Sequence, residues 1–397
     1  MNRANEHLPF LDGIRGIAIL AVFLFHSLGT SFGFDKLPWA GMFPDFDTSR
    51  SFLLLYPFTY GSAGVAIFFV VSGFCIHLSH RRGRDKGWTC FFNRRFFRIY
   101  PAYLLAICVF FFIWPWGSLH VDSFYRLAQL GSHVLAIHNL DQRSFFGINP
   151  SFWSIAVEIQ LYAIYPLLML LTARLGWRKG LMIVGIVEIL IRSVSSIHGI
   201  FSDEPLPCFI TASPFAYWLS WSLGAYLSEC FLTGRTSRLF LARFEVVAVV
   251  SLLLPLFKPT APFTFLSFSW LTAIAIDRFV TGRWSVPEVR GGRGGIFRAC
   301  WSHLSFLGIV SYSFYLFHQP IIGLTGKALG KFFPETFIHP LIKYAICMAW
   351  YPFILILSFI IYRLVEQPSI RLGKLAWDKI ESNKALHPTA ARVTPPA

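Results

Sequence analysis

Apolar stretches of about 20 residues recur along the chain from Pro9 to Leu364, with short polar connections between them. A helix of about 20 residues is long enough to cross the hydrocarbon core of a bilayer. The pattern therefore predicts an all-α, polytopic transmembrane helical bundle that fills one membrane domain, residues 1–381. The ten candidate spans are 9–29, 61–79, 99–115, 152–172, 180–197, 214–231, 244–257, 262–280, 304–323 and 338–362.

Composition and charge support this interpretation. Of the 397 residues, 55% are hydrophobic and 14% are charged, which lies outside the range of soluble globular proteins. With the N-terminus in the cytoplasm, the inner segments hold 26 of the 35 Lys and Arg residues and the outer segments hold 7. This positive-inside bias predicts that both termini are cytoplasmic, in the inner membrane if the protein is bacterial. The net charge of +15 then indicates membrane lipids or an anionic cofactor as partners, and no nucleic acid.

Two segments depart from the pattern of spans. Residues 124–140 are apolar in patches but include Arg126, His133 and His138, and an eleventh span there would invert every later connection against the charge bias. We therefore interpret this segment as interfacial or re-entrant. Residues 382–397 contain three prolines and few large apolar side chains, which predicts a disordered cytoplasmic tail.

Ionisable side chains within a span are costly, so each one is a candidate site residue. His26 follows Arg15 by eleven positions in the first span, which corresponds to three helical turns plus about 20° and a rise of roughly 16 Å. Both side chains therefore point to the same side, with Arg15 near the cytoplasmic end and His26 near the outer end. The alternative is that Arg15 extends to lipid phosphates and that His26 lies in the outer interface.

Glu158 and His318 belong to two other spans but are expected at a similar depth. By helix rise, Glu158 lies about 9 Å, His318 about 7 Å and His26 about 5 Å from the outer ends of their helices. The three side chains could meet, so that Glu158 orients His26 as a general base for a hydroxyl. Alternatively, Glu158 makes a packing hydrogen bond to a Ser or Tyr hydroxyl, and His318 has a structural role in the interface.

A basic and aromatic stretch leads into the third span and contains Arg94, Arg95 and Arg98. These residues either anchor the chain at the membrane surface or bind the phosphates of a cytoplasmic cofactor. Glu188 and Arg192, four residues apart, are expected to neutralise each other. Gly61, Gly64, Ser72 and Gly73 indicate close helix packing. No metal-binding spacing is present.

The order of these motifs resembles the membrane-bound acyltransferase 3 family, which O-acylates cell-surface polysaccharides and related acceptors. The resemblance rests on six stretches: Leu11-Asp12-Gly13 followed by Arg15 and His26, Phe68 to Phe74, Arg94 to Tyr103, Phe152 to Pro166, Ser311 to Pro320 and Tyr362 to Pro368. The family commonly has a second Glu where this chain has Ile159. This difference puts in doubt any role that needs two carboxylates there.

The resemblance implies an enzyme that moves an acyl group, commonly acetyl, from cytoplasmic acyl-CoA to a hydroxyl of a carbohydrate or lipid-linked glycan. Arg15, with Arg94, Arg95 or Arg98, would hold the phosphates of acyl-CoA, which is a substrate and not a permanently bound cofactor. His26, with Glu158 and His318, would carry the chemistry, either by direct transfer or through a covalent acyl-enzyme intermediate on Ser or Tyr. Many relatives have an added extracytoplasmic domain, so we expect this chain to acylate its acceptor directly or through a separate extracytoplasmic partner.

A different class of function is open at this point. Buried His and Glu side chains in a helical bundle also fit a proton-coupled transporter of a sugar or a lipid-linked intermediate. Against that interpretation, the sequence shows no inverted repeat, and the spacing of Arg15 and His26 has no evident use in transport.

Overall fold

The computed structural model describes residues 8–37, 49–113, 123–285, 295–332 and 338–386. Over these residues the fold is all-helical, as predicted, and contains no strand. The main helices are α1 (Phe10–Phe32), α3 (Ala63–Arg81), α4 (Trp88–Cys108), α6 (Phe152–Phe201), α8 (Trp218–Thr233), α9 (Phe244–Leu253), α10 (Thr264–Val280), α11 (Gly295–Ile309), α12 (Ser311–Phe332), α13 (Pro340–Ala349), α14 (Tyr351–Ile361) and α15 (Gln367–Leu386). Shorter helices are α2 (Arg50–Leu55), α5 (Ser123–Val134) and α7 (Cys208–Thr211).

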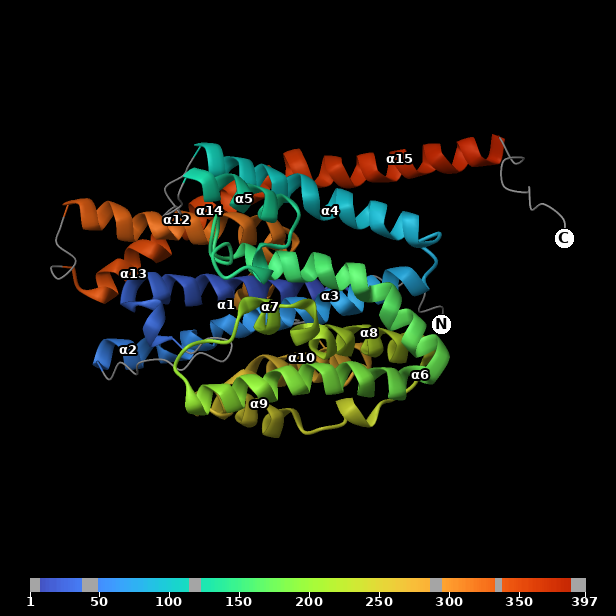
Figure 1. Cartoon of the computed structure of the whole chain (residues 1–397), viewed down its shortest axis with the longest axis horizontal. Coiled ribbons are helices and arrows are strands. Elements are labelled where there is room, and N and C mark those ends of the chain that lie inside the picture. Colours follow the sequence, from blue (N-terminus) through green and yellow to red (C-terminus); the bar gives the residue numbers. More distant parts are fainter. Residues whose placement is uncertain (1–7, 38–48, 114–122, 286–294, 333–337, 387–397) are drawn as a thin grey trace.

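Six described segments are long and apolar enough to cross a membrane: Phe10–Phe32, Arg50–Arg81, Trp88–Ile113, Phe152–Phe201, Ala261–Val280 and Pro340–Ser382. The predicted spans 152–172 and 180–197 both lie in α6, which turns back on itself in Figure 1. The turn occurs at Gly176, whose φ of 76° and ψ of 161° interrupt the helix. The predicted span 304–323 instead crosses the junction between α11 and α12.

Glycines let several helices approach until their backbones touch. A Cβ atom at Gly64 would lie 2.4 Å from the carbonyl oxygen of Ala18 on α1, and one at Gly73 would lie 2.1 Å from that of Trp221 on α8. A Cβ atom at Gly61 would lie 2.1 Å from the carbonyl oxygen of Ala21. The packing role predicted for Gly61, Gly64 and Gly73 is therefore confirmed, and α3 is held between α1 and α8.

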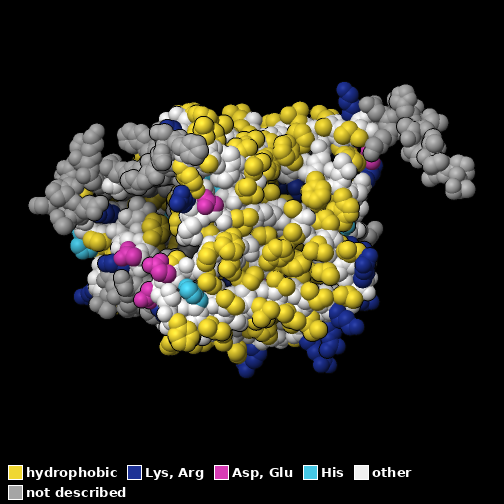
Figure 2. All heavy atoms as spheres, in the orientation of Figure 1, with side chains coloured by type: hydrophobic (Ala, Val, Ile, Leu, Met, Phe, Trp, Pro, Cys, Tyr) yellow, Lys and Arg dark blue, Asp and Glu magenta, His cyan; other side chains and the backbone are white. Residues whose placement is uncertain are grey.

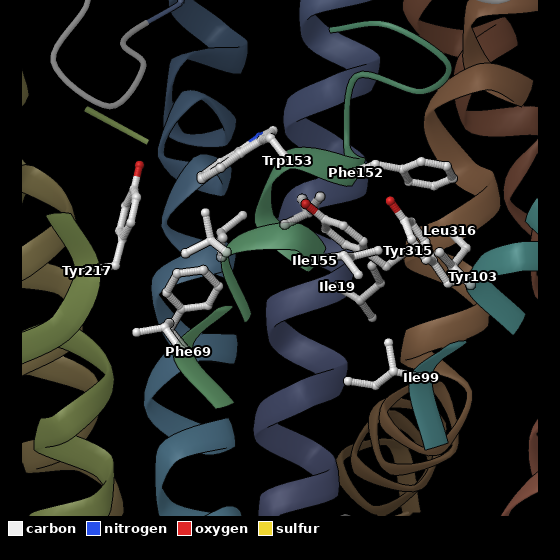
Figure 3. Packing of buried hydrophobic residues seen from close by; sticks show 14 of the residues in the cluster. Ile19, Phe69, Ile99, Tyr103, Phe152, Trp153, Ile155, Tyr217, Tyr315 and Leu316 are labelled. Carbon is white, nitrogen blue, oxygen red and sulfur yellow. The ribbon is translucent and has the colours of Figure 1, made fainter. Parts of the chain in front are cut away.

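The largest hydrophobic cluster joins α1, α3, α4, α6 and α12. In Figure 3, Phe152 and Trp153 at the start of α6 point to opposite sides, Phe152 toward Tyr103 and Leu316. Aromatic pairs make up much of this packing, including a T-shaped contact between Tyr103 and Phe152 with ring centroids 5.1 Å apart. The cluster fixes the start of α6 relative to α4 and α12.

The surface agrees with a membrane protein. Figure 2 shows apolar side chains over most of the visible face, and few charged side chains interrupt its centre. Many of the outward side chains on α6, α9 and α14 are large and apolar, among them Ile186, Leu190, Val249 and Ile356. In water such a surface would be unfavourable, whereas in a bilayer it faces lipid.

Two predicted boundaries are sharpened by the structure. The segment 124–140 begins within the twelve-residue helix α5, and a helix of that length is too short to cross a bilayer. Helix α15 continues to Leu386, so the boundary predicted at residue 382 lies inside a helix. The ion pair between Lys86 and Glu381, 2.7 Å, helps to hold that end of α15. Residues 387–397 of the predicted tail lie outside the described residues.

Candidate active site

Two histidines from distant parts of the sequence meet between α1 and α12. Nδ1 of His26 lies 2.9 Å from Nε2 of His318, and the ring centroids are 4.9 Å apart. The two residues are only 4% and 0% exposed. The predicted meeting of these two residues is confirmed, while their catalytic role stays a prediction.

The hydrogen bonds of His318 determine which nitrogen of each ring carries a proton. Nδ1 of His318 lies 2.8 Å from the carbonyl oxygen of Tyr315, which can only accept, so Nδ1 is the donor. In a neutral His318 ring, Nε2 is then an acceptor, and Nδ1 of His26 must donate to it. It follows that Nε2 of His26 carries the lone pair, which is the form of the ring that can take a proton.

Glu158 does not orient His26 in the way predicted. Its Oε1 accepts hydrogen bonds from Ser72 Oγ at 2.6 Å and from Tyr162 Oη at 2.5 Å. The alternative, a hydrogen bond to a Ser or Tyr hydroxyl, is the arrangement that the structure has. The next residue, Ile159, packs against the hydrophobic cluster and supplies no carboxylate.

The two residues differ in the neighbouring helix that they face and not in depth, because His26 and Glu158 each lie six residues, about 9 Å, from the outer end of their helix. Helix α1 continues to Phe32, beyond the predicted end at residue 29, and α6 begins at Phe152. One turn before Glu158 on α6, Ser154 Oγ lies 2.7 Å from Tyr315 Oη, so this turn of α6 faces α12. Glu158 instead meets α3, through Ser72.

Arg15 joins α1 to α3. Its guanidinium donates to Asp12 Oδ1 at 2.8 Å and to Cys75 Sγ at 3.1 Å. The side chains of Arg15 and Asp12 are 21% and 23% exposed. Arg15 is therefore oriented by two neighbours.

One face of α3 touches three of the predicted site residues. Ser72 bonds to Glu158, Cys75 to Arg15, and Ser79 to Arg94 at 3.5 Å. Spacings of three and four residues place these side chains on one helix face. The sequence interpretation assigned this region to packing and missed Ser72 and Cys75, although their spacing within an apolar helix was a usable signal.

The three arginines of α4 do not act as one group. Arg95 is 7% exposed, donates to Asp85 Oδ1 at 2.6 Å and lies over the ring of Phe91. Arg94 shares the same carboxylate oxygen at 2.9 Å. Arg98, in contrast, is exposed. Asp85 thus offsets much of the charge of Arg95 and Arg94, and Arg98 is the better placed of the three for a phosphate.

Helix α12 contributes polar side chains to four different neighbours. Tyr312 Oη donates to the carbonyl oxygen of Ile99 on α4 at 2.9 Å. Ser313 donates to Glu366 in the short helix η12 (Tyr362–Glu366), Tyr315 meets Ser154 on α6, and His318 meets His26 on α1. These hydroxyl partners could not be found from the sequence, because they depend on how the helices pack.

Other predicted polar contacts lie apart from this group. Glu188 and Arg192 form a buried ion pair of 2.7 Å, as predicted, and Ser220 Oγ also donates to Glu188, at 2.6 Å. Among the described residues, no group of three or more His, Cys, Asp or Glu side chains is arranged to hold a metal ion.

Comparison with known proteins identifies the family of the chain. Residues 8–363 match the acyltransferase 3 family, whose description is an acyltransferase domain. The chain belongs to the acyltransferase 3 family. This membership identifies an acyltransferase enzyme and makes a transporter the weaker interpretation.

Several curated proteins are similar to the chain. Acyltransferase MdmB of Streptomyces mycarofaciens is 26% identical over 353 residues, which cover 81% of each chain. The putative peptidoglycan O-acetyltransferase YrhL of Bacillus subtilis is 24% identical, over 92% of this chain and 55% of its own length. Peptidoglycan O-acetyltransferase OatA of Listeria monocytogenes is 27% identical, over 45% of this chain and 26% of its own. The chain therefore matches only part of the two peptidoglycan enzymes. No solved structure matches the chain.

Proposed function

We propose that this chain is an integral-membrane O-acyltransferase that moves an acyl group, acetyl in the first instance, from cytoplasmic acyl-CoA to a hydroxyl of a cell-envelope carbohydrate or related acceptor. The observation that carries the proposal is the contact between His26 and His318. The hydrogen bonds of this pair leave the lone pair on Nε2 of His26. That nitrogen is the candidate general base.

The reaction proceeds by attack of the acceptor hydroxyl on the thioester. The hydroxyl oxygen forms a bond to the carbonyl carbon while Nε2 of His26 takes the hydroxyl proton. The bond between carbon and sulfur then breaks, and the proton passes from His26 to the leaving thiolate of CoA. His318 keeps His26 in the required tautomer through the hydrogen bond to Nδ1.

Donor binding is assigned to the other end of α1. Arg15 and Arg98 hold the phosphates of acyl-CoA, with Arg94 as a weaker contributor because of its bond to Asp85. Arg15 and His26 are eleven positions apart, a rise of roughly 16 Å. An extended pantetheine arm can bridge that distance along α1.

The orientation in the membrane completes the proposal. Ten spans, with both termini in the cytoplasm, would put Arg15 on the side where acyl-CoA is made and His26 toward the outer half. The charge bias of the sequence supports this, as does Figure 1, in which the start of α1 and the end of α15 lie toward the same end of the bundle. In a bacterium this would be the inner membrane. The acceptor is a carbohydrate or lipid-linked glycan, reached directly or through a separate extracytoplasmic protein.

A transfer assay tests the proposal. Purified protein in liposomes is incubated with radiolabelled acetyl-CoA and extracted cell-envelope glycan, and the label in the glycan fraction is measured. We expect transfer by the native protein and none by His26→Ala, with both variants equally folded by size-exclusion chromatography. Label that remains entirely on CoA with the native protein would overturn the proposal. Mass spectrometry of surface glycans with and without the gene then identifies the acceptor by an added acetyl group.

A further inference from the structure

Helix α12 has a gap in its backbone hydrogen bonds beside His318. In an α-helix the N–H of residue 320 donates to the carbonyl of residue 316, but Pro320 has no N–H. The carbonyl of Leu316 thus loses its normal donor in a fully buried position, where an unpaired carbonyl is costly. Another group has to supply that hydrogen bond.

Asn149 supplies it from the loop before α6. Its Nδ2 donates to the carbonyl oxygen of Leu316 at 2.8 Å, and the residue is 0% exposed. The orientation of the amide is determined by Ser151, whose backbone N–H donates to Oδ1 of Asn149 at 2.9 Å. One side chain thus ties the start of α6 to the turn of α12 that carries His318.

A second contact holds the same turn. Ser151 Oγ donates to the side-chain oxygen of Gln319. Leu316 and Gln319 precede and follow His318 in the sequence, so the loop before α6 is bonded to the chain on either side of the histidine. His318 in turn determines the tautomer of His26.

We propose that Asn149 is a positioning residue for His318: its amide replaces the hydrogen bond that Pro320 removes from α12. The consequence for the rate of acyl transfer rests on the proposed function, whereas the consequence for the geometry of His318 does not. Asn149 acts through α12, because its hydrogen bond goes to the backbone of Leu316.

A double-mutant cycle isolates this contact. Asn149→Ala removes the donor, and Pro320→Ala returns a backbone N–H to α12, so that Asn149 becomes dispensable. We expect Asn149→Ala to lower kcat for acetyl transfer about 10-fold with the KM for acetyl-CoA unchanged, because a buried carbonyl loses its partner. In the Pro320→Ala background, the same substitution should change kcat less than about twofold.

The geometry is measured separately, by the rate at which diethyl pyrocarbonate modifies His318, followed by mass spectrometry. Asn149→Ala should accelerate modification in the native background and not in the Pro320→Ala background. This measurement does not need acetyl transfer, so it tests the inference even if the native protein transfers no label.

Asn139→Ala is the matched control. Asn139 is also 0% exposed and lies in the same loop, but its Nδ2 donates to the carbonyl of Ala212, away from α12. Adding Pro320→Ala should therefore not reverse any effect of Asn139→Ala on the rate of His318 modification. Equal effects of Asn149→Ala on His318 modification in the two backgrounds, or rescue of Asn139→Ala by Pro320→Ala, would overturn the proposal.

Discussion

The guanidinium of Arg15 lies 3.1 Å from the Sγ atom of Cys75, so the charged end of α1 is held against the middle of α3. The same guanidinium pairs with Asp12 one turn earlier on α1. These two contacts orient the cation, whose side chain is partly exposed, whereas His26 farther along the helix is buried.

Replacing Arg15 by Ala should mainly weaken donor binding. A charged hydrogen bond contributes about 1.5–3 kcal/mol, so we expect the KM for acetyl-CoA to rise roughly 10- to 100-fold while kcat falls less. Initial rates across a range of acetyl-CoA concentrations measure this change. Arg15→Lys keeps the charge, so its KM for acetyl-CoA should lie between that of the native protein and that of Arg15→Ala. A loss confined to kcat would contradict the assignment.

Replacing His26 should instead affect the chemical step. Loss of a general base lowers kcat by roughly 10²- to 10⁴-fold, and His26→Gln should reach this range with little change in donor KM. His318→Gln should cost less, because it removes the neighbour that sets the tautomer and leaves the base in place. Single-turnover rates at saturating acetyl-CoA show which of the two substitutions lowers the rate more. A larger loss in His318→Gln than in His26→Gln would reverse the two roles.

Arg95 and Arg98 form a matched pair on α4. Arg95→Ala leaves the buried Asp85 with only Arg94 as a hydrogen-bonded arginine, so the free energy of unfolding should fall by about 1–3 kcal/mol. Arg98→Ala should leave the melting temperature unchanged and raise the KM for acetyl-CoA. Thermal unfolding in detergent and titrations with acetyl-CoA distinguish the two variants. A lowered melting temperature in Arg98→Ala would contradict the assignment of Arg95 to stability and Arg98 to donor binding.

Stability should fall in mild acid because of His133 and His138, which lie in and after α5, outside the six long apolar segments. Their rings are stacked with centroids 3.8 Å apart. Burial lowers the pKa of His133 to about 4, and burial with the neighbouring His133 lowers that of His138 well below its usual value of 6.5. The unfolded chain therefore binds more protons than the folded one below about pH 6.5, so stability decreases as the pH falls from there toward 4.

Melting temperatures from pH 7 to 4 measure this effect. The double variant of His133→Gln with His138→Gln should show a shallower decline over that interval than the native protein. Equal slopes would show that other groups account for the sensitivity to acid.

The sequence predicted the class of fold and a site in which His26, His318 and Glu158 could meet, and the structure brings the two histidines of that group together. Hydrophobic periodicity and side-specific charge are strong signals in a membrane protein, since each span must be apolar along most of its length. The depth of the two histidines could be estimated because each lies on a long helix.

The position of Glu158 and the pairing of Arg95 were not predictable in the same way. Counting residues from a helix end gives the depth of Glu158 but not the neighbouring helix that it faces, which is α3. The pairing of Arg95 depends on Asp85, which precedes α4 and turns back onto it. Hydrophobic periodicity alone predicts neither the path of a loop nor which neighbouring helix a polar side chain will face.

The contacts of α12 have a mechanical consequence. Tyr312, Ser313, Tyr315 and His318 each reach a different neighbour within about two helical turns. A slide of α12 by one turn, about 5.4 Å, would break all four contacts at once. These contacts therefore oppose sliding of α12 and hold the two histidines together.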